Sequence, residues 1–409
     1  MIGLSNVDVI ETARKFKAQG ISPAFIVPTE TGLEKAIMDA TQLVRERLAE
    51  WGIHEFVSQL QGTAHKREVR SVLIGRSGVR DGVACSLYRP ATKSGDPRIW
   101  FSKLKQDALS EDLLAICPSF DGTLVVINCS VIDLDKLLGE GIVLIDGIPA
   151  GLYDQTSLLV SAVNQNPYLE VLTEKLREVC ARSFIRTMRG NDTGVGYTLE
   201  SLLGIAANSN RRPDFHGIEI KSARSRTKLR GQTTLFSKTP DWERSRLKGS
   251  VGILAERGVF SESKQRVQVI HEIGAPKPNS YGMQLVVRES DDRLDQITVL
   301  EERKEFDVTW ALSVLKQCIA DKHGETVWVT ADSRGRDESE EFWYNEARYT
   351  SGPDLTMLPL LLDSGAITVH YTIKEKPNGG VKDQGYLFKM AAKHSSTLFN
   401  RIIPISLLN

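Results

Sequence analysis

The stretch that most restricts the fold of this chain covers residues 213–221 and reads PDFHGIEIK. Side chains alternate between the two faces of a strand, so Ile218 and Ile220 are predicted to face a core while Glu219 and Lys221 share the other face. Asp214 precedes a His-Gly pair that can bend the backbone, so its carboxylate can return to the neighbourhood of Glu219. The pattern requires a sheet that buries one face of this strand and keeps two carboxylates and an ammonium together on the other.

The chemistry of these three side chains indicates a phosphodiesterase. Two converging carboxylates make the kind of site that Mg²⁺ occupies in proteins. A lysine beside the metal can orient or activate a water for attack on phosphorus. The alternative is the solvated face of an edge strand, because Asp, Glu and Lys are common and the spacing of Asp214, Glu219 and Lys221 arises by chance in many chains.

Length and composition predict a globular protein of two or three domains. The chain has 409 residues, 41% of them hydrophobic and 25% charged, which is enough for a sizeable core. No apolar run approaches the ~18 residues of a membrane span, and the first residues do not resemble a secretory signal. The five cysteines are widely spaced and form no Cys-x-x-Cys pair, which argues against a disulfide framework or a zinc cluster. We therefore expect a protein of a reducing cytoplasm.

The charge pattern is informative only locally, because the formal net charge is zero. Residues 221–248 carry nine Lys and Arg residues against Asp241 and Glu243. A polyanion needs only one basic face, so this run predicts phosphate contacts near the carboxylates. The alternative is a solvated loop.

Periodicity along the chain predicts a mixed α/β organisation. Apolar residues at helical spacing predict helices over 6–19, from Thr29 or Thr31 to Gly52, over 168–188 and over 198–207, and strands are predicted over 69–74, 82–88 and 123–128. Loss of periodicity before residue 166 places a domain boundary there. Residues 1–165 are predicted to form a smaller accessory α+β domain, and residues 166–409 the catalytic domain. In the accessory domain, Arg89, Lys93 and Arg98 can contact a phosphate backbone, and the alternative is a surface loop anchored by buried aromatic residues.

Three segments together resemble a known family. They are residues 190–200 (GNDTGVGYTLE), 213–221 (PDFHGIEIK) and 234–240 (TLFSKTP). Their order and spacing are similar to those of the MvaI/BcnI-type restriction endonucleases, relatives of the mismatch-repair nickase MutH within the PD-(D/E)xK nuclease superfamily. The resemblance covers roughly residues 168–409. It implies a MutH-like fold, a mixed β-sheet flanked by helices, whose cleft holds duplex DNA.

The resemblance also implies roles for the site residues. Asp214 and Glu219 match the metal-binding carboxylates, Lys221 matches the lysine of the motif, and the backbone carbonyl of Ile220 completes the site for Mg²⁺. Glu200 matches an additional acidic residue facing the metal, whereas from its position alone it would serve only the dipole of its helix. The implied reaction is in-line attack of water on the scissile phosphate, leaving a 5′-phosphate and a 3′-hydroxyl.

Sequence reading is expected in the later part of the chain. Residues 367–374 and 383–389 resemble a β-hairpin that the family inserts into the major groove, where base edges present distinct patterns. The residues expected to contact DNA are Arg224, Lys228, Lys238, Asn345, Arg348, His370, Asp383, Gln384 and Lys389. The chain departs from its relatives at His370, at Thr372 and over 382–385, so the usual cytosine-rich CC-N-GG target is only an expectation.

These observations favour a Mg²⁺-dependent type II restriction endonuclease acting on duplex DNA, alongside a companion DNA methyltransferase. One alternative is a MutH-like strand-nicking repair enzyme. The other is a DNA-binding protein on an inactive nuclease fold, against which the intact Asp214, Glu219 and Lys221 argue. We expect a monomer. The N-terminal domain is expected to bind a second DNA site as an effector, or else to stabilise the fold or contact a protein partner.

Overall fold

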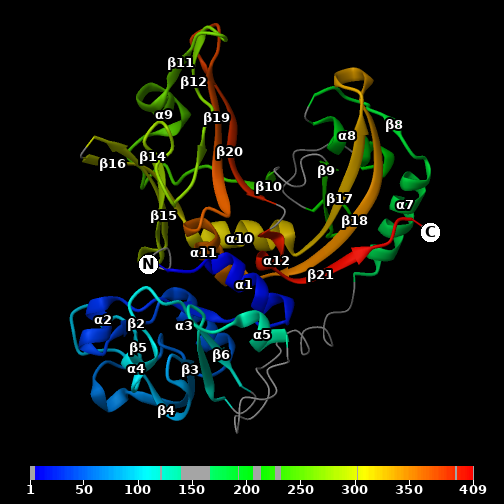
Figure 1. Cartoon of the computed structure of the whole chain (residues 1–409). Coiled ribbons are helices and arrows are strands. Elements are labelled where there is room, and N and C mark those ends of the chain that lie inside the picture. The colour runs from blue at the N-terminus through cyan, green and yellow to red at the C-terminus, as the bar shows by residue number, and fades with distance from the viewer. Residues whose placement is uncertain are drawn as a thin grey trace. The chain divides into compact units, whose positions relative to one another are not determined.

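The computed structural model describes residues 5–119, 122–139, 166–191, 193–205, 213–225, 232–301, 303–391 and 394–408. The chain divides into two compact units (Figure 1). Unit 1 contains Met1–Ala162 and Glu289–Asp291, and unit 2 contains Val163–Arg288 and Asp292–Asn409. The predicted boundary between residues 165 and 166 lies at the end of a segment outside the described residues and stays a prediction. The predicted mixed α/β class is confirmed.

Unit 1 is built on one mixed sheet with short helices. Its strand order is β1-β6-β7-β3-β4-β5-β2, in which β3 and β7 run parallel and the other neighbours antiparallel. The described elements are α1 (Val9–Ala18), β1 (Ala24–Ile26), α2 (Glu30–Lys35), β2 (Met38–Asp39), α3 (Gln42–Glu50), a 3₁₀ turn (Thr63–His65), β3 (Arg67–Gly75), β4 (Gly78–Tyr88), β5 (Arg98–Phe101), α4 (Leu104–Asp107), β6 (Leu114–Pro118), β7 (Leu124–Asn128) and α5 (Leu134–Gly139).

The long helix predicted up to Gly52 is wrong, because the structure divides it. Ala36 ends α2 in the left-handed conformation, with a φ of 55°. Strand β2 follows, and Thr41 then begins α3 by accepting a hydrogen bond from the Val44 amide. The apolar residues of both pieces keep helical spacing, so periodicity alone did not reveal that the chain pairs with β5 between them.

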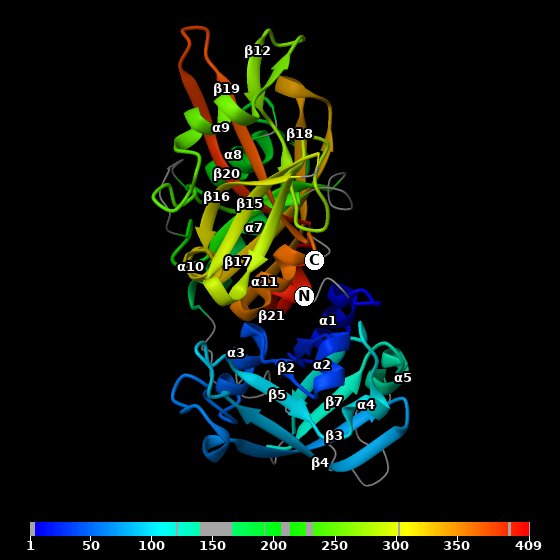
Figure 2. The same ribbon diagram turned by 90° about the vertical axis from the view of Figure 1, so that its left-hand side faces the viewer.

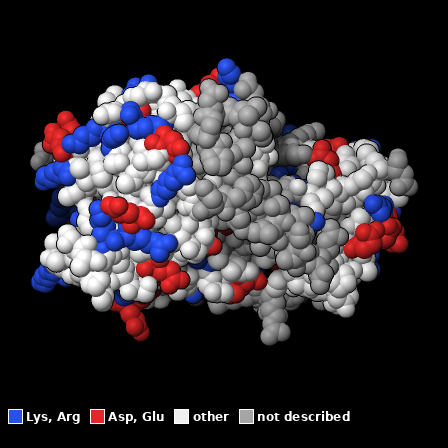
Figure 3. Space-filling model, turned by 90° about the horizontal axis from the view of Figure 1, so that it is seen from below, with Lys and Arg blue, Asp and Glu red and all other residues white. Residues whose placement is uncertain are grey.

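The basic residues of unit 1 are largely bound within the unit. The structure pairs Arg70 with Asp81 at 2.7 Å, Arg76 with Asp112 at 3.0 Å and Arg98 with Asp39. Arg89 donates to the carbonyl oxygens of Gly95 and Gln59. Among the described residues, the face in Figure 3 likewise carries Lys and Arg interspersed with Asp and Glu. Among the charged groups of the predicted loop, Lys93 is an exposed cation.

Unit 2 holds the predicted motif. Its described elements are α7 (Tyr168–Ala181), β8 (Ile185–Arg186), α8 (Gly194–Leu202), β9 (Glu219–Arg224), β10 (Gln232–Ser237), α9 (Gly249–Arg257), β11 (Val259–Ser261), β12 (Arg266–Val269), β13 (Glu272–Ile273), β14 (Met283–Arg288), β15 (Arg293–Leu300), β16 (Arg303–Ala311), α10 (Leu312–His323), β17 (Glu325–Arg334), β18 (Glu341–Pro353), α11 (Leu358–Asp363), β19 (Ile367–Glu375), β20 (Val381–Ala391), α12 (Ser395–Leu398) and β21 (Phe399–Ile405), with 3₁₀ turns at Asp337–Ser339 and Leu355–Met357.

The described strands of unit 2 form three sheets. The first has the order β21-β18-β17-β9, with β8 beside β18, and only β9 and β17 run parallel. The second has the order β10-β20-β19-β12-β11, with β13 beside β19, and the third is β14-β15-β16. Strands β19 and β20 form the predicted hairpin, which is confirmed and is visible as a long ribbon in Figures 1 and 2.

The core of unit 2 lies between the first sheet and helices α7 and α8. Leu172 and Leu176 of α7 and Leu199 of α8 pack with Ile218 and Ile220, all at most 4% exposed. This confirms that Ile218 and Ile220 face a core. Each of the two predicted helices had a wrong boundary, because α7 ends at residue 181 and not at 188, and α8 begins at residue 194 and not at 198.

Two further predictions concern the whole chain. All five cysteines are free. Within the described residues, no helix combines the length and the apolar character needed to cross a membrane.

Candidate active site

A tight turn brings Asp214 to the start of β9. Phe215 and Ile218 exchange backbone hydrogen bonds of 2.9 and 2.8 Å, which closes a turn at His216 and Gly217. Both turn residues have positive φ, 47° and 92°, as in the tightest hairpin turns. The chain thereby returns so that Oδ2 of Asp214 accepts a hydrogen bond of 3.0 Å from the Ile220 amide.

The beginning of α7 holds this turn in place. The ring of Tyr168 stacks on the ring of His216 at 3.9 Å, with 8° between their planes. The side-chain amide of Asn166 donates to the His216 carbonyl at 3.1 Å and to Glu325 at 2.7 Å. A non-glycine residue at positive φ is costly without such support. These contacts therefore fix the backbone that carries Asp214.

Glu219 is a buried carboxylate held by two lysines. Its side chain is 1% exposed, Lys221 forms an ion pair with its Oε1 atom, and the Nζ atom of Lys322 lies 3.3 Å from the same oxygen. Neither oxygen accepts a hydrogen bond of good geometry from the described residues. Burial raises the pKa of Glu219, and the charge of Lys221 opposes that rise.

Glu200 joins the same group from α8. Helix α8 lies close to β9 at Gly196. A Cβ atom added to this glycine would lie 3.7 Å from Oγ of Ser222 on β9 and 3.9 Å from Oε1 of Glu200. Burial raises the pKa of Glu200, the charge of Asp214 adds to the rise, and Lys221 opposes it. The structure thus brings the four predicted catalytic residues, Glu200, Asp214, Glu219 and Lys221, into one electrostatic group.

The donor set fits a hard cation with an incomplete protein shell. Among the described residues, no three His, Cys, Asp or Glu side chains form a compact metal-binding cluster. Mg²⁺ is commonly held by one or two carboxylates, with waters and substrate phosphates as the other ligands. The buried Glu219 oxygens that lack hydrogen bonds, beside Asp214, match that description.

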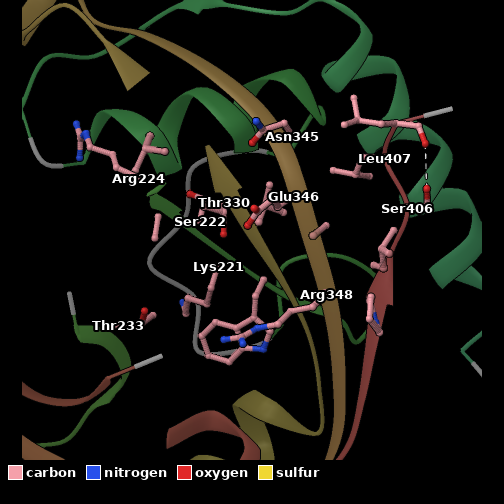
Figure 4. A pocket seen from close by; sticks show the side chains of 18 of the residues that line it. Lys221, Ser222, Arg224, Thr233, Thr330, Asn345, Glu346, Arg348, Ser406 and Leu407 are labelled. Atoms are coloured by element: carbon pink, nitrogen blue, oxygen red, sulfur yellow. Dashed lines mark hydrogen bonds between the residues drawn. The ribbon is translucent and has the colours of Figure 1, made fainter. Parts of the chain in front are cut away.

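A pocket of about 710 Å³ begins at Lys221 and is lined by residues of β9, β10, β17, β18 and β21. Lys221 lies opposite Trp328 of β17, and Trp328 lies opposite Arg348 of β18. Register partners share a face of a sheet, so Arg348 lies on the same face as Lys221, about 10 Å away along the backbone ladder. Its guanidinium lies 5.7 Å from the Trp328 ring centre, and burial lowers its pKa. Figure 4 shows Arg348 on the same side of the pocket as Lys221.

Part of the predicted basic run is bound internally. Arg224 donates two hydrogen bonds of 2.7 Å to the carboxylate of Glu340. The ammonium of Lys248 donates to backbone carbonyls, among them that of Ser245 at 2.6 Å. Lys228 lies outside the described residues. Arg224 and Lys248 are therefore bound within the protein, and the phosphate contacts expected of the run as a whole stay a prediction.

The residues expected to read DNA fall into different groups. Asn345 lines the pocket with Arg348 and donates to Asp332 at 2.8 Å. On the hairpin, burial lowers the pKa of His370 and the charge of Lys389 lowers it further, so these two side chains lie near each other.

The hairpin residues do not all converge. Asp383 accepts a hydrogen bond of 2.5 Å from Ser250 of α9, away from His370. Gln384 is exposed, and Lys238 belongs to the segment after β10, where its carbonyl accepts from the Trp310 ring. The pocket and the His370 side of the hairpin are adjacent, because Gln232 lines the pocket and also donates to Thr368 at 3.3 Å.

Sequence reasoning missed Lys322, Trp328 and Tyr168. Lys322 lies 101 residues after Lys221 and belongs to no recognised motif. Only the packing of α10 against the strands brings it to Glu219. Tyr168 carried a weak signal, since it follows directly on the Asn-Pro pair at the predicted domain boundary.

Comparison with known proteins places the chain in a family. The sequence profile of the MvaI/BcnI restriction endonuclease family matches residues 173–399, more than half of the 409 residues. A solved restriction endonuclease MvaI–cognate DNA substrate complex is similar at 22% identity and a TM-score of 0.53, over 59% of this chain and 100% of that chain. Restriction endonuclease MvaI in the absence of DNA is similar at 21% identity and a TM-score of 0.39, over 59% of this chain and 99% of that chain.

No match was found among curated proteins. The likeness to the DNA complex shows a shared fold, and the profile match confirms the resemblance inferred from the three motifs. The chain therefore belongs to the MvaI/BcnI restriction endonuclease family.

Proposed function

We propose that this protein is a Mg²⁺-dependent type II restriction endonuclease, which hydrolyses phosphodiester bonds in both strands of duplex DNA at a short cytosine-rich sequence of the CC-N-GG type. One observation carries the proposal. In a member of a restriction endonuclease family, the buried carboxylate of Glu219 is paired with Lys221 and Lys322 and lies in one electrostatic group with Asp214 and Glu200. Burying a charged carboxylate costs free energy, so an inactive copy of the fold is expected to have lost this arrangement.

The residues of the site have separate roles in this proposal. Asp214, Glu219 and the backbone carbonyl of Ile220 would hold Mg²⁺, which lowers the pKa of water and offsets charge that develops on the phosphate. Lys221 is placed to orient the attacking water, since its ammonium already lies beside Glu219. Glu200 adds negative charge to the same group and so favours a divalent cation there.

The DNA strand would lie along the pocket that begins at Lys221. Arg348 supplies a half-buried positive charge there, stacked on Trp328. Asn345, from the same strand as Arg348, can contact a base edge. The adjacent polar side of the hairpin, with His370 and Lys389, would enter the major groove.

The biological setting follows from the activity. A restriction enzyme requires a companion methyltransferase that protects the host's own sites, and both would act in a prokaryotic cytoplasm. We propose that the chain acts as a monomer and that residues 1–165 bind a second DNA site as an effector. Linking two binding modules raises their joint affinity through effective concentration. Deleting residues 1–165 should then change the relative rates on one-site and two-site plasmids, and equal rates before and after deletion would exclude the effector role.

The main experiment is digestion of unmethylated plasmid with Mg²⁺, comparing the intact chain with Asp214→Asn and sequencing the ends. Asparagine can still accept the Ile220 hydrogen bond, so the variant removes the charge and spares the turn. Discrete fragments that vanish in the variant would support the proposal. Nicked circles alone would favour a MutH-like nickase, and a gel shift without any cleavage would favour a DNA-binding protein on an inactive fold.

A further inference from the structure

Lys322 contacts the active site from an element that carries no catalytic motif. It is in the last turn of α10, and its ammonium lies 3.3 Å from Oε1 of Glu219. The Lys322 side chain is 27% exposed and the Glu219 side chain 1%. The Glu219 carboxylate is therefore buried inside the protein, while the Lys322 side chain reaches the solvent-exposed side, where substrate would lie.

The backbone next to Lys322 is firmly anchored. His323 is fully buried, and its ring nitrogens lie 2.8 Å from the Leu235 carbonyl on β10 and 2.9 Å from the Thr326 hydroxyl on β17. Its ring also stacks on Trp328, with 4° between the planes. Strands β10 and β17 both line the pocket. Hydrogen bonds of His323 thus hold the C-terminal end of α10 against two strands that line the pocket, which fixes the backbone position of Lys322.

The charges around Glu219 explain why a second lysine is needed. The electrostatic group contains three carboxylates, those of Glu200, Asp214 and Glu219, and two ammonium groups, those of Lys221 and Lys322. A buried carboxylate is costly without a compensating charge. A divalent cation at Glu219 would supply that charge itself, so Lys322 and the cation compete for the same carboxylate.

We propose that Lys322 is a second active-site lysine, which neutralises Glu219 in the metal-free chain and turns to a phosphate oxygen of the bound strand once a divalent cation holds Glu219. The second half of this statement rests on the proposed nuclease function. The first half concerns only this chain and a cation. The side chain needs to move only its flexible end, because its backbone is fixed by His323.

The test compares Lys322→Met with Lys322→Arg and with Lys316→Met, which removes the same charge from the same helix away from Glu219. Binding of Mn²⁺ to the full chain without DNA is measured by electron paramagnetic resonance. Lys322→Met should bind Mn²⁺ about tenfold more tightly than wild type, because a charged contact to Glu219 is removed. Lys322→Arg and Lys316→Met should bind Mn²⁺ as wild type does.

Single-turnover cleavage at saturating Mg²⁺ provides the second readout. Lys322→Met should cleave about 100-fold more slowly, since a charged hydrogen bond to phosphate is lost, and Lys322→Arg should recover much of the rate. A purely structural role would not give tighter Mn²⁺ binding together with slower cleavage. If wild type cleaves no DNA, the proposed function fails, while the Mn²⁺ comparison still decides the role of Lys322 at Glu219.

Folding is checked by thermal melting, and Lys322→Gln repeats the test with a second neutral side chain. Unchanged Mn²⁺ affinity in the folded neutral variants would overturn the competition with the cation. Unchanged cleavage would overturn the phosphate contact. If neither neutral variant folds, Lys322 serves the fold, and the proposal is overturned as well.

Discussion

The buried His323 should make the protein less stable in mild acid. Burial lowers the pKa of His323 to about 3, from an ordinary value of 6.5. The folded chain therefore holds the ring neutral, whereas the unfolded chain protonates it as the pH falls below 6.5. The stability contributed by the neutral ring is complete above pH 6.5 and is lost progressively as the pH falls toward about 3.

The size of the loss follows from the two pKa values. Each unit between the pH and the pKa of the unfolded chain is worth about 1.4 kcal/mol. At about pH 5, protonation of His323 in the unfolded chain should lower the free energy of unfolding by about 2 kcal/mol relative to neutral pH. This is a large part of the stability of an ordinary domain.

The assay is urea unfolding followed by tryptophan fluorescence at about pH 7 and pH 5 and constant ionic strength. The control is His323→Gln, which cannot titrate in this range and whose amide can still donate to the Leu235 carbonyl. Wild type should lose about 2 kcal/mol more than this variant between the two pH values. The other histidines are common to both proteins and cancel in the comparison. Equal losses would refute the view that His323 is held neutral.

Three further predictions concern the site and its surroundings. Tyr168→Ala should remove the support of the turn that carries Asp214, so single-turnover cleavage should slow about tenfold with little change in a gel shift. Tyr168→Phe keeps the ring and should cleave at close to the wild-type rate. Equal cleavage rates in the two variants would contradict this role of Tyr168. Arg224→Gln should lower the free energy of unfolding by about 2 kcal/mol, because Glu340 loses its partner, and a weaker gel shift at unchanged stability would show instead that Arg224 binds DNA. Arg348→Met should weaken DNA binding and reduce the slope of log affinity against log salt by about one, and an unchanged slope would remove Arg348 from the phosphate contacts.

The local conformation of the motif could be predicted from the sequence, because it depends on residues that are close together in the chain. Alternation in residues 218–221 predicted which side chains enter the core, and the structure confirms it for Ile218 and Ile220. The His-Gly pair predicted the bend that returns Asp214 to β9. The hairpin of β19 and β20 was expected from the resemblance to the family, and the pairing of the two strands confirms it.

Predictions failed where distant parts of the chain decide the local conformation. The helix predicted up to Gly52 is interrupted by β2, because pairing with β5 competes successfully with helical periodicity. The expected DNA contact of Arg224, inferred from its position after the motif, stays a prediction. The sequence did not predict that its guanidinium donates to Glu340, which lies 116 residues further along the chain.

The sequence by itself determined the family and the mixed α/β class, and it singled out Glu200, Asp214, Glu219 and Lys221 as the candidates for catalysis, since all of these depend on residue types at short, fixed spacings. Only the tertiary structure decided that Glu219 is shared between Lys221 and Lys322, that Tyr168 stacks on the turn beside Asp214, and that Arg348 lies in register with Lys221 across Trp328. These contacts join residues that are tens to more than one hundred positions apart. No local propensity specifies such pairs, because they form only when the packing of helices and the register of strands bring their side chains together.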